Sequence, residues 1–591
     1  MVLNLAQPGV MRPEGFGHLA FFALGPWALA ASRPGRRAFL AEWLAHAVGL
    51  LGWFLWMRHL LPWLLVPMAL IPALYMAAGG ALLRRLARRS PLALAAPVAW
   101  GAAELVRWHL PAPFSFGWLR TGELLHDTLW LSGSARVWGS HGLTYVLGAL
   151  GGLAADLALA RRSARPGPDR QGQGQGQGQS QSQGQGGGQG LSGATLALGA
   201  GPLALGVLLA LFVPAPATSG SVGVVIAQPG IEQSLKGGRG DYVRDEFTPL
   251  VEEALAGIAE ATAGGAPPPE LLLCGETILS GWLVPQEVLA AYDAGVRPPA
   301  WSSRADLARL DLEVRDARAR VLVAAFFGDA RVLRPLRSMV AQVFGGLRAE
   351  WARDVLAGRR LLPEGTALLG GVEAWDVVEG ELRRRNALAL WDAAGDLAGI
   401  ASKVQLVPAA ESLEPVKHLP FVISAVQRVV GSVPDFVGAP TTQVLELRRA
   451  AGAPLRIGAT ICYDNAFDKP YTEPLRRGPV DLFVIASNEA WYLDSCEMDH
   501  LLALARMRAL CTGRPVVRAT NSGISAVIGG DGRDLAVLEV DGRRKMVRGH
   551  LAARVPLPAD PAARTPFVAT ERWQLAGWFA LALLLAFRAR R

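Results

Sequence analysis

Apolar segments that alternate with arginine-rich loops fill the first third of the chain, and they constrain its fold more than any other feature. Six of them precede residue 214 and one closes the chain: Gly17–Ser32, Phe39–Met57, Pro62–Leu83, Leu92–Trp108, Val137–Ala160, Leu191–Val213 and Trp573–Phe587. A helix needs about 17–25 residues to cross a bilayer. The pattern therefore predicts a polytopic α-helical membrane domain.

Basic residues follow every second apolar segment. Arginines cluster at 33–37, 84–89, 161–170 and 588–591. Cytoplasmic loops of membrane proteins are enriched in Lys and Arg, so we expect these loops in the cytoplasm and the region Pro214–Glu571 outside it. The net charge of +9 fits this arrangement better than nucleic-acid binding, because the arginines lie beside apolar segments.

Composition also divides the chain into domains. Residues 1–215 form the expected membrane domain, which contains a Gln/Gly-rich linker at 171–190 with nothing to bury. Residues 216–570 form an expected α/β domain, and 571–591 form a C-terminal transmembrane helix. Short β-like runs occur at 221–228, 270–276, 320–328, 386–392, 455–464, 481–488, 515–521 and 525–532. Strands that alternate with helices indicate a layered α/β sheet, and we expect an arginine-rich helical insertion at about 286–362.

Three reactive residue types stand at the ends of predicted strands. Glu276 follows ELLLCG, Lys403 follows GIAS, and Cys462 closes RIGATIC. If the three meet in a pocket, the carboxylate can take the thiol proton. The ammonium can favour the thiolate and stabilise an oxyanion. Composition alone assigns none of them to catalysis, because each residue type is more often structural.

Several longer motifs occur in order along the chain: APVAWGAAELVR, VVIAQPGIEQSLK, ETILSGW, KVQLVPAAE, ICYDNAF, SNEAWYLDS and RPVVRATNSGISAVI. In these motifs the chain resembles the apolipoprotein N-acyltransferase family, the membrane-bound branch of the nitrilase (carbon-nitrogen hydrolase) superfamily, from near that family's second membrane helix onward. The resemblance implies a nitrilase-like α-β-β-α sandwich with a catalytic triad of Glu276, Lys403 and Cys462. It also implies supporting or substrate-binding roles for Glu411, Tyr463, Asp464, Asn386, Asn488 and Trp491.

The activity implied by the resemblance is transfer of an acyl chain from a phospholipid to the N-terminal amine of an apolipoprotein's diacylglyceryl-cysteine. Cys462 would carry the chain as a thioester in a ping-pong reaction. The implied setting is a monomer in the bacterial cytoplasmic (inner) membrane with its catalytic domain on the periplasmic side. Its partners are membrane lipid, a phospholipid donor and a diacylated lipoprotein acceptor, without nucleic acid, metal or cofactor. Two other hypotheses stay open: a membrane-tethered nitrilase-type amidase, and an inactive lipoprotein-binding paralogue.

Two charged groups of the helical segments allow more than one interpretation. Glu104 and Arg107 share a helix face inside an apolar segment, so they either pair with each other or serve a function. His500, Arg506 and Arg508 follow helical spacing, and we expect them to make structural salt links on a helix that packs on the sheet.

The remaining cysteines and the insertion are interpreted more simply. The cysteines lack the spacing of a structural zinc site. Cys274 and Cys511 are expected in the core, and Cys496 is a weaker candidate nucleophile than Cys462 because no strand precedes it. The insertion either lies on an anionic membrane surface or forms a solvated helical hairpin.

Overall fold

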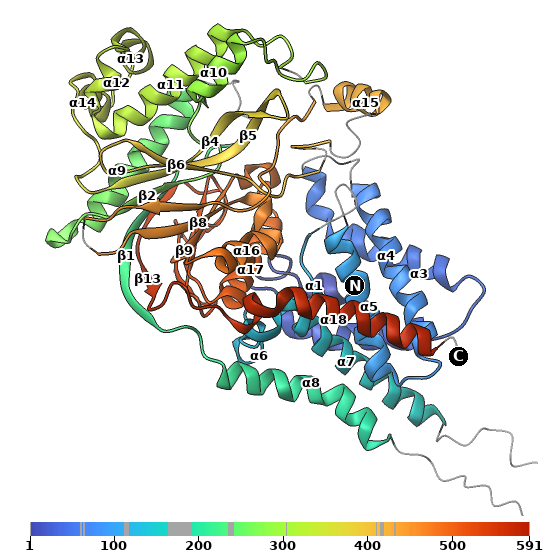
Figure 1. Cartoon of the computed structure of the whole chain (residues 1–591). Coiled ribbons are helices and arrows are strands. Elements are labelled where there is room, and N and C mark those ends of the chain that lie inside the picture. The colour runs from blue at the N-terminus through green and yellow to red at the C-terminus, as the bar shows by residue number, and fades with distance from the viewer. Residues whose placement is uncertain are drawn as a thin grey trace, which may run out of the picture.

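The computed structural model describes residues 2–59, 62, 65–110, 117–163, 191–233, 241–302, 304–408, 410–413, 419–430, 433–450 and 452–589. The predicted linker at 171–190 lies outside the described residues. Figure 1 shows two parts, a bundle of helices and a domain of two β-sheets with helices on their outer faces.

A helix occupies each of the seven apolar segments. The helical part contains α1 (Val2–Ala6), η1 (Gly17–Leu19), α2 (Ala20–Ala31), α3 (Ala38–Trp53), η2 (Leu55–His59), α4 (Leu65–Leu86), α5 (Leu92–His109), η4 (Thr121–Leu125), α6 (Leu129–Ser132), α7 (Ala135–Ser163), α8 (Gly193–Phe212) and α18 (Pro566–Arg588). Among the described residues, α4, α7 and α8 are long and apolar enough to cross a membrane, whereas the apolar helices at Gly17–Ala31 and Ala38–Trp53 are shorter. The last helix starts at Pro566, before the predicted Trp573.

The first sheet is mixed and runs in the order β13-β1-β2-β4-β5-β6, with β3 beside β4. β1 pairs with β2 and β2 with β4 in parallel, whereas β4, β5 and β6 form an antiparallel meander. The bounds are β1 (Thr218–Gln228), β2 (Leu271–Cys274), β3 (Trp282–Leu283), β4 (Ala367–Val378), β5 (Glu381–Trp391), β6 (Leu397–Ser402) and β13 (Gly549–Pro558).

The second sheet runs in the order β12-β11-β10-β9-β8-β7. Its centre is parallel, because β8 pairs with β9 and β9 with β10 in the same direction. The bounds are β7 (Val444–Leu447), β8 (Leu455–Ile461), β9 (Leu482–Ser487), β10 (Val516–Thr520), β11 (Ala526–Ile528) and β12 (Asp534–Val537). Central parallel strands are buried on both faces and are mostly apolar; β9 is buried along its whole length, and Ser487 at its end is its one polar residue.

The two sheets pack face to face and helices cover their outer faces, as the expected α-β-β-α sandwich requires. Along β1, Val224 and Ile226 face the second sheet, whereas Val225 and Ala227 pack under helices. Successive side chains of a strand point to opposite faces. Because the side chains on both faces of β1 are apolar, the strand packs against an apolar core on each side. The outer helices of the first sheet are η5 (Val243–Phe247), α9 (Thr248–Ala261) and η6 (Ala263–Gly265). Those of the second sheet are α16 (Lys469–Arg477) and α17 (Glu497–Thr512). Two short turns, η8 (Cys462–Ala466) and η9 (Glu489–Tyr492), lie at strand ends.

The β-strand predicted at residues 320–328 is wrong. Those residues form the second half of helix α11 (Arg309–Phe327). An apolar run of this length fits a strand or a buried helix equally well. Here the run packs in the core over the first sheet, where Val321 and Phe326 are fully buried.

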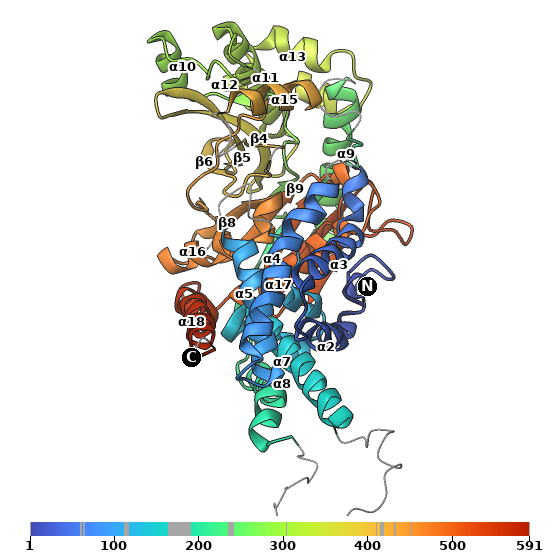
Figure 2. The same cartoon turned by 90° about the vertical axis from the view of Figure 1, so that its right-hand side faces the viewer.

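Residues 286–362 form helices between β3 and β4: α10 (Gln286–Asp293), α11, α12 (Ala330–Leu333), α13 (Arg337–Phe344) and α14 (Glu350–Leu356). Figures 1 and 2 show these helices at the end of the molecule that is opposite the helical part. This position favours the alternative of helices on the outer domain over contact with a membrane at the helical part. The insertion is more than the expected solvated hairpin, because Phe344 and Trp351 are buried in the apolar core over the first sheet.

A continuous apolar core joins the helical part to the second sheet. Trp56 and Trp118 of the helical part share one cluster with Tyr463 and Leu504 of the sandwich. Helix α17 is buried on every side, because it lies between the second sheet and the helical part (Figure 1). The two parts therefore form one packed unit.

Gly371 of β4 allows the close approach of the segment that carries Glu276. A Cβ at Gly371 would lie 2.6 Å from the Gly275 carbonyl oxygen and 2.7 Å from Glu276 Cα. We expect Gly371→Ala to displace this segment and to lower the free energy of unfolding by about 2 kcal/mol. Thermal unfolding of the detergent-purified protein measures the change.

Gly370→Ala is the matched control. A Cβ at Gly370 would come nearest to the end of the Leu279 side chain, at 3.0 Å, and its three nearest neighbours are all side-chain atoms. A loss of stability at Gly370 equal to that at Gly371 would contradict this account of the close approach.

Candidate active site

The three reactive residues lie at strand ends of the two facing sheets. Glu276 lies two residues after β2, Lys403 directly follows β6, and Cys462 directly follows β8. The backbone N–H of Lys403 also donates to the Asn386 carbonyl of the neighbouring β5 at 2.8 Å. Rigid strands therefore aim all three side chains at the same end of the sandwich.

Lys403 lies between two carboxylates. Its Nζ is 3.3 Å from Glu276 Oε1 and 2.9 Å from Glu411 Oε2. The Asn386 side-chain amide donates to the same pair, to Glu276 Oε1 at 2.6 Å and to Glu411 Oε1 at 3.0 Å. Although burial acts to lower the pKa of Lys403, the charges of Glu276 and Glu411 hold that pKa well above its usual value. Lys403 is therefore an ammonium.

A tight turn presents Cys462. The residue has a φ of 48°, in the left-handed region that residues with a side chain seldom adopt. Asp464 stabilises the turn, since its carboxylate accepts from the N–H groups of Ile461 at 3.0 Å and Gln405 at 2.6 Å. One side chain thus ties the Cys462 turn to the loop that follows Lys403. Burial raises the pKa of the Asp464 carboxyl to about 7, against the opposing effects of Lys403 and the backbone N–H donors.

Cys462 is buried, with 9% of its surface exposed. Burial and the charge of Glu276 raise the pKa of its thiol well above the usual value, and the charge of Lys403 acts in the opposite direction. The resting thiol is therefore protonated. A nucleophile in this state needs a base, and Glu276 is the buried carboxylate whose charge acts on it most strongly.

The supporting residues of the resemblance lie around this group. The backbone N–H of Asn488 donates to Glu276 Oε2 at 2.9 Å, and its side chain is held by Gln233 and Asn521. The Tyr463 hydroxyl accepts from the Gly117 N–H of the helical part at 3.3 Å. Trp491 is 46% exposed; of the predicted site residues it is the one that lies on the surface.

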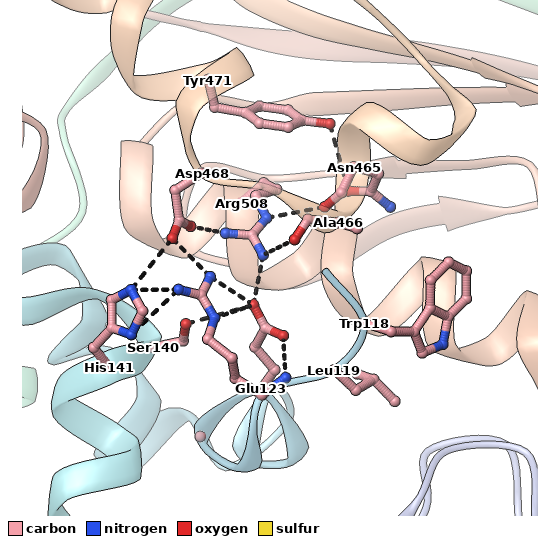
Figure 3. Close-up of polar contacts among 12 residues, drawn as sticks. Trp118, Leu119, Glu123, Ser140, His141, Asn465, Ala466, Asp468, Tyr471 and Arg508 are labelled. Atoms are coloured by element: carbon pink, nitrogen blue, oxygen red, sulfur yellow. Dashed lines mark hydrogen bonds and ion pairs between the residues drawn. The ribbon is translucent and has the colours of Figure 1, made fainter. Parts of the chain in front are cut away.

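The turn after Cys462 is joined to the helical part by buried charges (Figure 3). Arg508 of α17 donates to the carbonyls of Asn465 and Ala466, and it pairs with Glu123 and Asp468. Arg120 pairs with the same two carboxylates, at 2.9 Å to Glu123 and 2.7 Å to Asp468. We call Arg120, Glu123, Asp468 and Arg508 the junction network. All four side chains are buried. The predicted salt links of the 499–511 helix are confirmed for Arg506 with Asp534 and for Arg508.

Glu104 and Arg107 bind separate partners. Glu104 accepts from the Thr121 hydroxyl at 2.6 Å and from the Thr144 hydroxyl at 3.0 Å. Arg107 donates to the carbonyls of Trp118 and Leu119. Both residues therefore hold the segment 117–121, and Trp118 of this segment stacks on Tyr463 with ring centroids 6.1 Å apart. The stacking of Trp118 on Tyr463 is not predicted from the sequence, because its only signal is a short aromatic motif between helices.

The other cysteines differ from Cys462 in position. Burial raises the pKa of Cys274 to about 12 and that of Cys511 to about 11, and both lie in apolar clusters. Cys496 is half-buried at the start of α17, and burial raises its pKa to about 12. Among the described residues, no group of three or more His, Cys, Asp or Glu side chains could hold a metal ion.

Sequence comparison agrees with both parts of the fold. The carbon-nitrogen hydrolase family matches residues 364–543, and the N-terminal domain of apolipoprotein N-acyltransferase matches residues 5–153. An amidase of the nitrilase superfamily from Nesterenkonia is 16% identical with a TM-score of 0.32, over 62% of this chain and 99% of its own. The double sheet and the carbon-nitrogen hydrolase match define the class as the nitrilase superfamily.

Relatives named apolipoprotein N-acyltransferase narrow the class. The protein of Ralstonia nicotianae is 36% identical over 23% of this chain and 25% of its own. The proteins of Bradyrhizobium diazoefficiens and Azotobacter vinelandii are 34% and 31% identical, over 39% and 41% of this chain and 40% and 44% of their own. The matches thus span less than half the length of these relatives. The two family matches and these relatives support the apolipoprotein N-acyltransferase family of the nitrilase superfamily for this chain.

The charges around Cys462 predict opposite effects of two substitutions on its reactivity. Because Glu276 raises the thiol pKa and Lys403 lowers it, we expect Glu276→Gln to speed alkylation of Cys462 by iodoacetamide at fixed pH. Lys403→Met should slow it. Peptide mass spectrometry of a Cys496→Ser background measures the rate at Cys462 alone. Changes in the same direction for both variants would contradict this electrostatic account.

The junction network predicts a large cost for losing one charge. Glu123→Gln leaves two buried guanidinium groups with one carboxylate, and breaking a buried pair costs about 3–5 kcal/mol. The same change at Glu313, whose pair with Arg309 is exposed, should cost about 1 kcal/mol or less. Thermal unfolding of both variants tests this, and equal losses would show that the network adds nothing to the junction.

Proposed function

We propose that this chain transfers an acyl chain from a phospholipid to the N-terminal amine of a lipoprotein, with Cys462 as nucleophile. The proposal rests on one observation above the others. The turn that carries Cys462 packs directly against the membrane helices, through Tyr463, Trp118 and the junction network. A thiol at this position can reach a lipid ester at the membrane interface, whereas a soluble amide substrate would need no such junction.

In the first half-reaction, the Cys462 sulfur attacks the ester carbonyl while Glu276 takes the thiol proton. The tetrahedral intermediate carries a negative oxygen, which Lys403 stabilises. Glu276 and Glu411 accept two of the three ammonium N–H donors of Lys403, and the third is directed to the oxyanion. Collapse breaks the ester C–O bond. The proton passes from Glu276 to the leaving oxygen, a lysophospholipid departs, and a thioester remains.

In the second half-reaction, the lipoprotein amine attacks the thioester carbonyl. Glu276 accepts a proton from the amine, Lys403 again stabilises the oxyanion, and the C–S bond breaks. The proton returns to sulfur, so the enzyme is regenerated and an amide is formed. Asn386 and Glu411 are positioning residues, because their hydrogen bonds keep the side chains of Glu276 and Lys403 in contact.

The same proposal includes the membrane setting. We propose that residues 1–215 and the last helix span the bacterial inner membrane, and that residues 216–570 form the catalytic domain on the periplasmic side. Support comes from the basic residues at the ends of α4, α7 and α18. In Figure 1 these ends point away from the sheets, and basic ends face the cytoplasm.

Purified protein with a phospholipid and a synthetic diacylated lipopeptide tests the reaction. We expect a triacylated lipopeptide and a lysophospholipid in equal amounts, and a trapped acyl group on Cys462 when the lipopeptide is left out. Cys462→Ser should lower turnover by at least about 10³-fold. The matched control is Cys496→Ser, which should keep normal turnover. Mass spectrometry of the products gives all three results.

Complementation of a bacterial strain depleted of its own lipoprotein N-acyltransferase gives the cellular test. Wild type and Cys496→Ser should restore growth, and Cys462→Ser should not. Release of free fatty acid or ammonia, without acylated lipopeptide, would contradict the transferase proposal and favour hydrolysis. Transfer that persists in Cys462→Ser would contradict the assignment of the nucleophile.

A further inference from the structure

A polar cavity lies in the helical part, at the end that is far from the candidate active site. Its volume is about 730 Å³, and it is lined by Ser32, Pro34, Gly35, Ala81, Arg84, Arg85, Ala87, Arg88 and Ala589. Three separate segments thus enclose it: the loop after α2, the last turns of α4, and the end of α18. We call it the basic cavity.

The length of α4 separates the basic cavity from the candidate active site. The segment before α4 packs on the catalytic domain, since the ring centroids of Trp56 and Tyr492 lie 5.2 Å apart. Helix α4 then runs for 22 residues, which is about 33 Å at 1.5 Å per residue. The hydrocarbon core of a bilayer is about 30 Å thick. In the membrane setting proposed above, on which this inference rests, the basic cavity and Cys462 lie at opposite faces of the membrane.

Among the described residues, the protein supplies one carboxylate to the three arginines of the cavity. Arg84 pairs with Glu42 of α3. Arg85 donates to the Ala586 carbonyl at 3.0 Å, and within the described ranges neither Arg85 nor Arg88 forms an ion pair. Three guanidinium groups less one carboxylate leave two positive charges. Exposed arginines at 33, 36, 37 and 89 are close in sequence to the lining residues and add to the positive charge of these segments.

We propose that the basic cavity binds the headgroup of an anionic phospholipid that carries two negative charges, in the leaflet opposite the catalytic domain. Guanidinium groups bind phosphate oxygens in pairs of hydrogen bonds, and basic pockets between membrane helices suit such headgroups. The ligand is a lipid because the helix that ends at the cavity presents exposed apolar side chains in its last turns. Leu583, Leu584 and Phe587 of α18 are 71%, 52% and 55% exposed, and they precede the cavity residue Ala589 along the same helix.

Binding at this site would join three parts of the chain that are far apart in sequence. The loop at 32–35, the end of α4 and the end of α18 would share one doubly charged ligand. A ligand that binds only the folded state stabilises it in proportion to its occupancy. We therefore expect the lipid to raise the unfolding temperature without contact with Glu276, Lys403 or Cys462.

The test measures lipid binding to the full chain, purified in detergent and freed of lipid, by native mass spectrometry. Cardiolipin, which carries two phosphates, should bind more tightly than zwitterionic phosphatidylethanolamine. Arg88→Gln should weaken cardiolipin binding about fivefold, and Arg85→Gln with Arg88→Gln more than about tenfold, from about 1 kcal/mol for each basic side chain. Equal affinity for the two lipids would overturn the proposal.

The matched control is Arg161→Gln with Arg162→Gln. These two arginines are exposed at the end of α7 and do not line the cavity, so the same loss of charge should leave cardiolipin binding unchanged. An equal loss in both double variants would show general attraction to a basic surface and overturn the site. Displacement of cardiolipin by an equal concentration of inorganic phosphate would assign the cavity to a free anion and overturn the lipid assignment.

Arg88→Gln alone controls for a loss of lipid binding that is caused by misfolding. Arg88 is exposed, so Arg88→Gln should unfold at the wild-type temperature without lipid. Its rise in unfolding temperature with cardiolipin should be smaller than that of the wild type. An undiminished rise in this variant would contradict the role of Arg88.

Discussion

The junction network of Arg120, Glu123, Asp468 and Arg508 is the interaction on which the arrangement of the molecule depends. Four charges are buried at the boundary of two parts that come from distant segments of the chain. Burying a charge is costly unless it is paired and hydrogen-bonded. Each part supplies one carboxylate and one guanidinium, so neither could bury its own pair as favourably alone. The helical part and the sandwich consequently hold each other in a fixed orientation.

This orientation decides where the reactive thiol lies. Arg508 binds the carbonyls of the turn after Cys462, and Tyr463 binds the segment that follows α5. Around Lys403, two carboxylates and an amide form a second buried network. The first network positions Cys462 relative to the helical part, and the second positions Glu276 and Lys403 relative to each other. The site is thus supported by hydrogen bonds on both sides.

The sequence predicted the parts with strong local signals. Each apolar segment coincides with a helix, and Glu276, Lys403 and Cys462 follow strands that were recognised or implied from composition and motifs. The apolar run at 320–327 predicts a strand but forms a helix, because a run that is buried on all sides shows no period that separates the two. The network of Arg120 and Glu123 with Asp468 and Arg508 could not be predicted. It depends on pairing between residues hundreds of positions apart, which no local pattern records.

The long excursion between β2 and β4 has a consequence for how the molecule matures. These strands are parallel neighbours, with Leu271 opposite Ala367, and helices α10–α14 fill the chain between them. Contacts that close so long a loop form late and slowly in folding. Glu276, just after β2, therefore reaches its final place only after the excursion has closed. Until then Lys403 lacks one of the two carboxylates that bind its ammonium in the buried site.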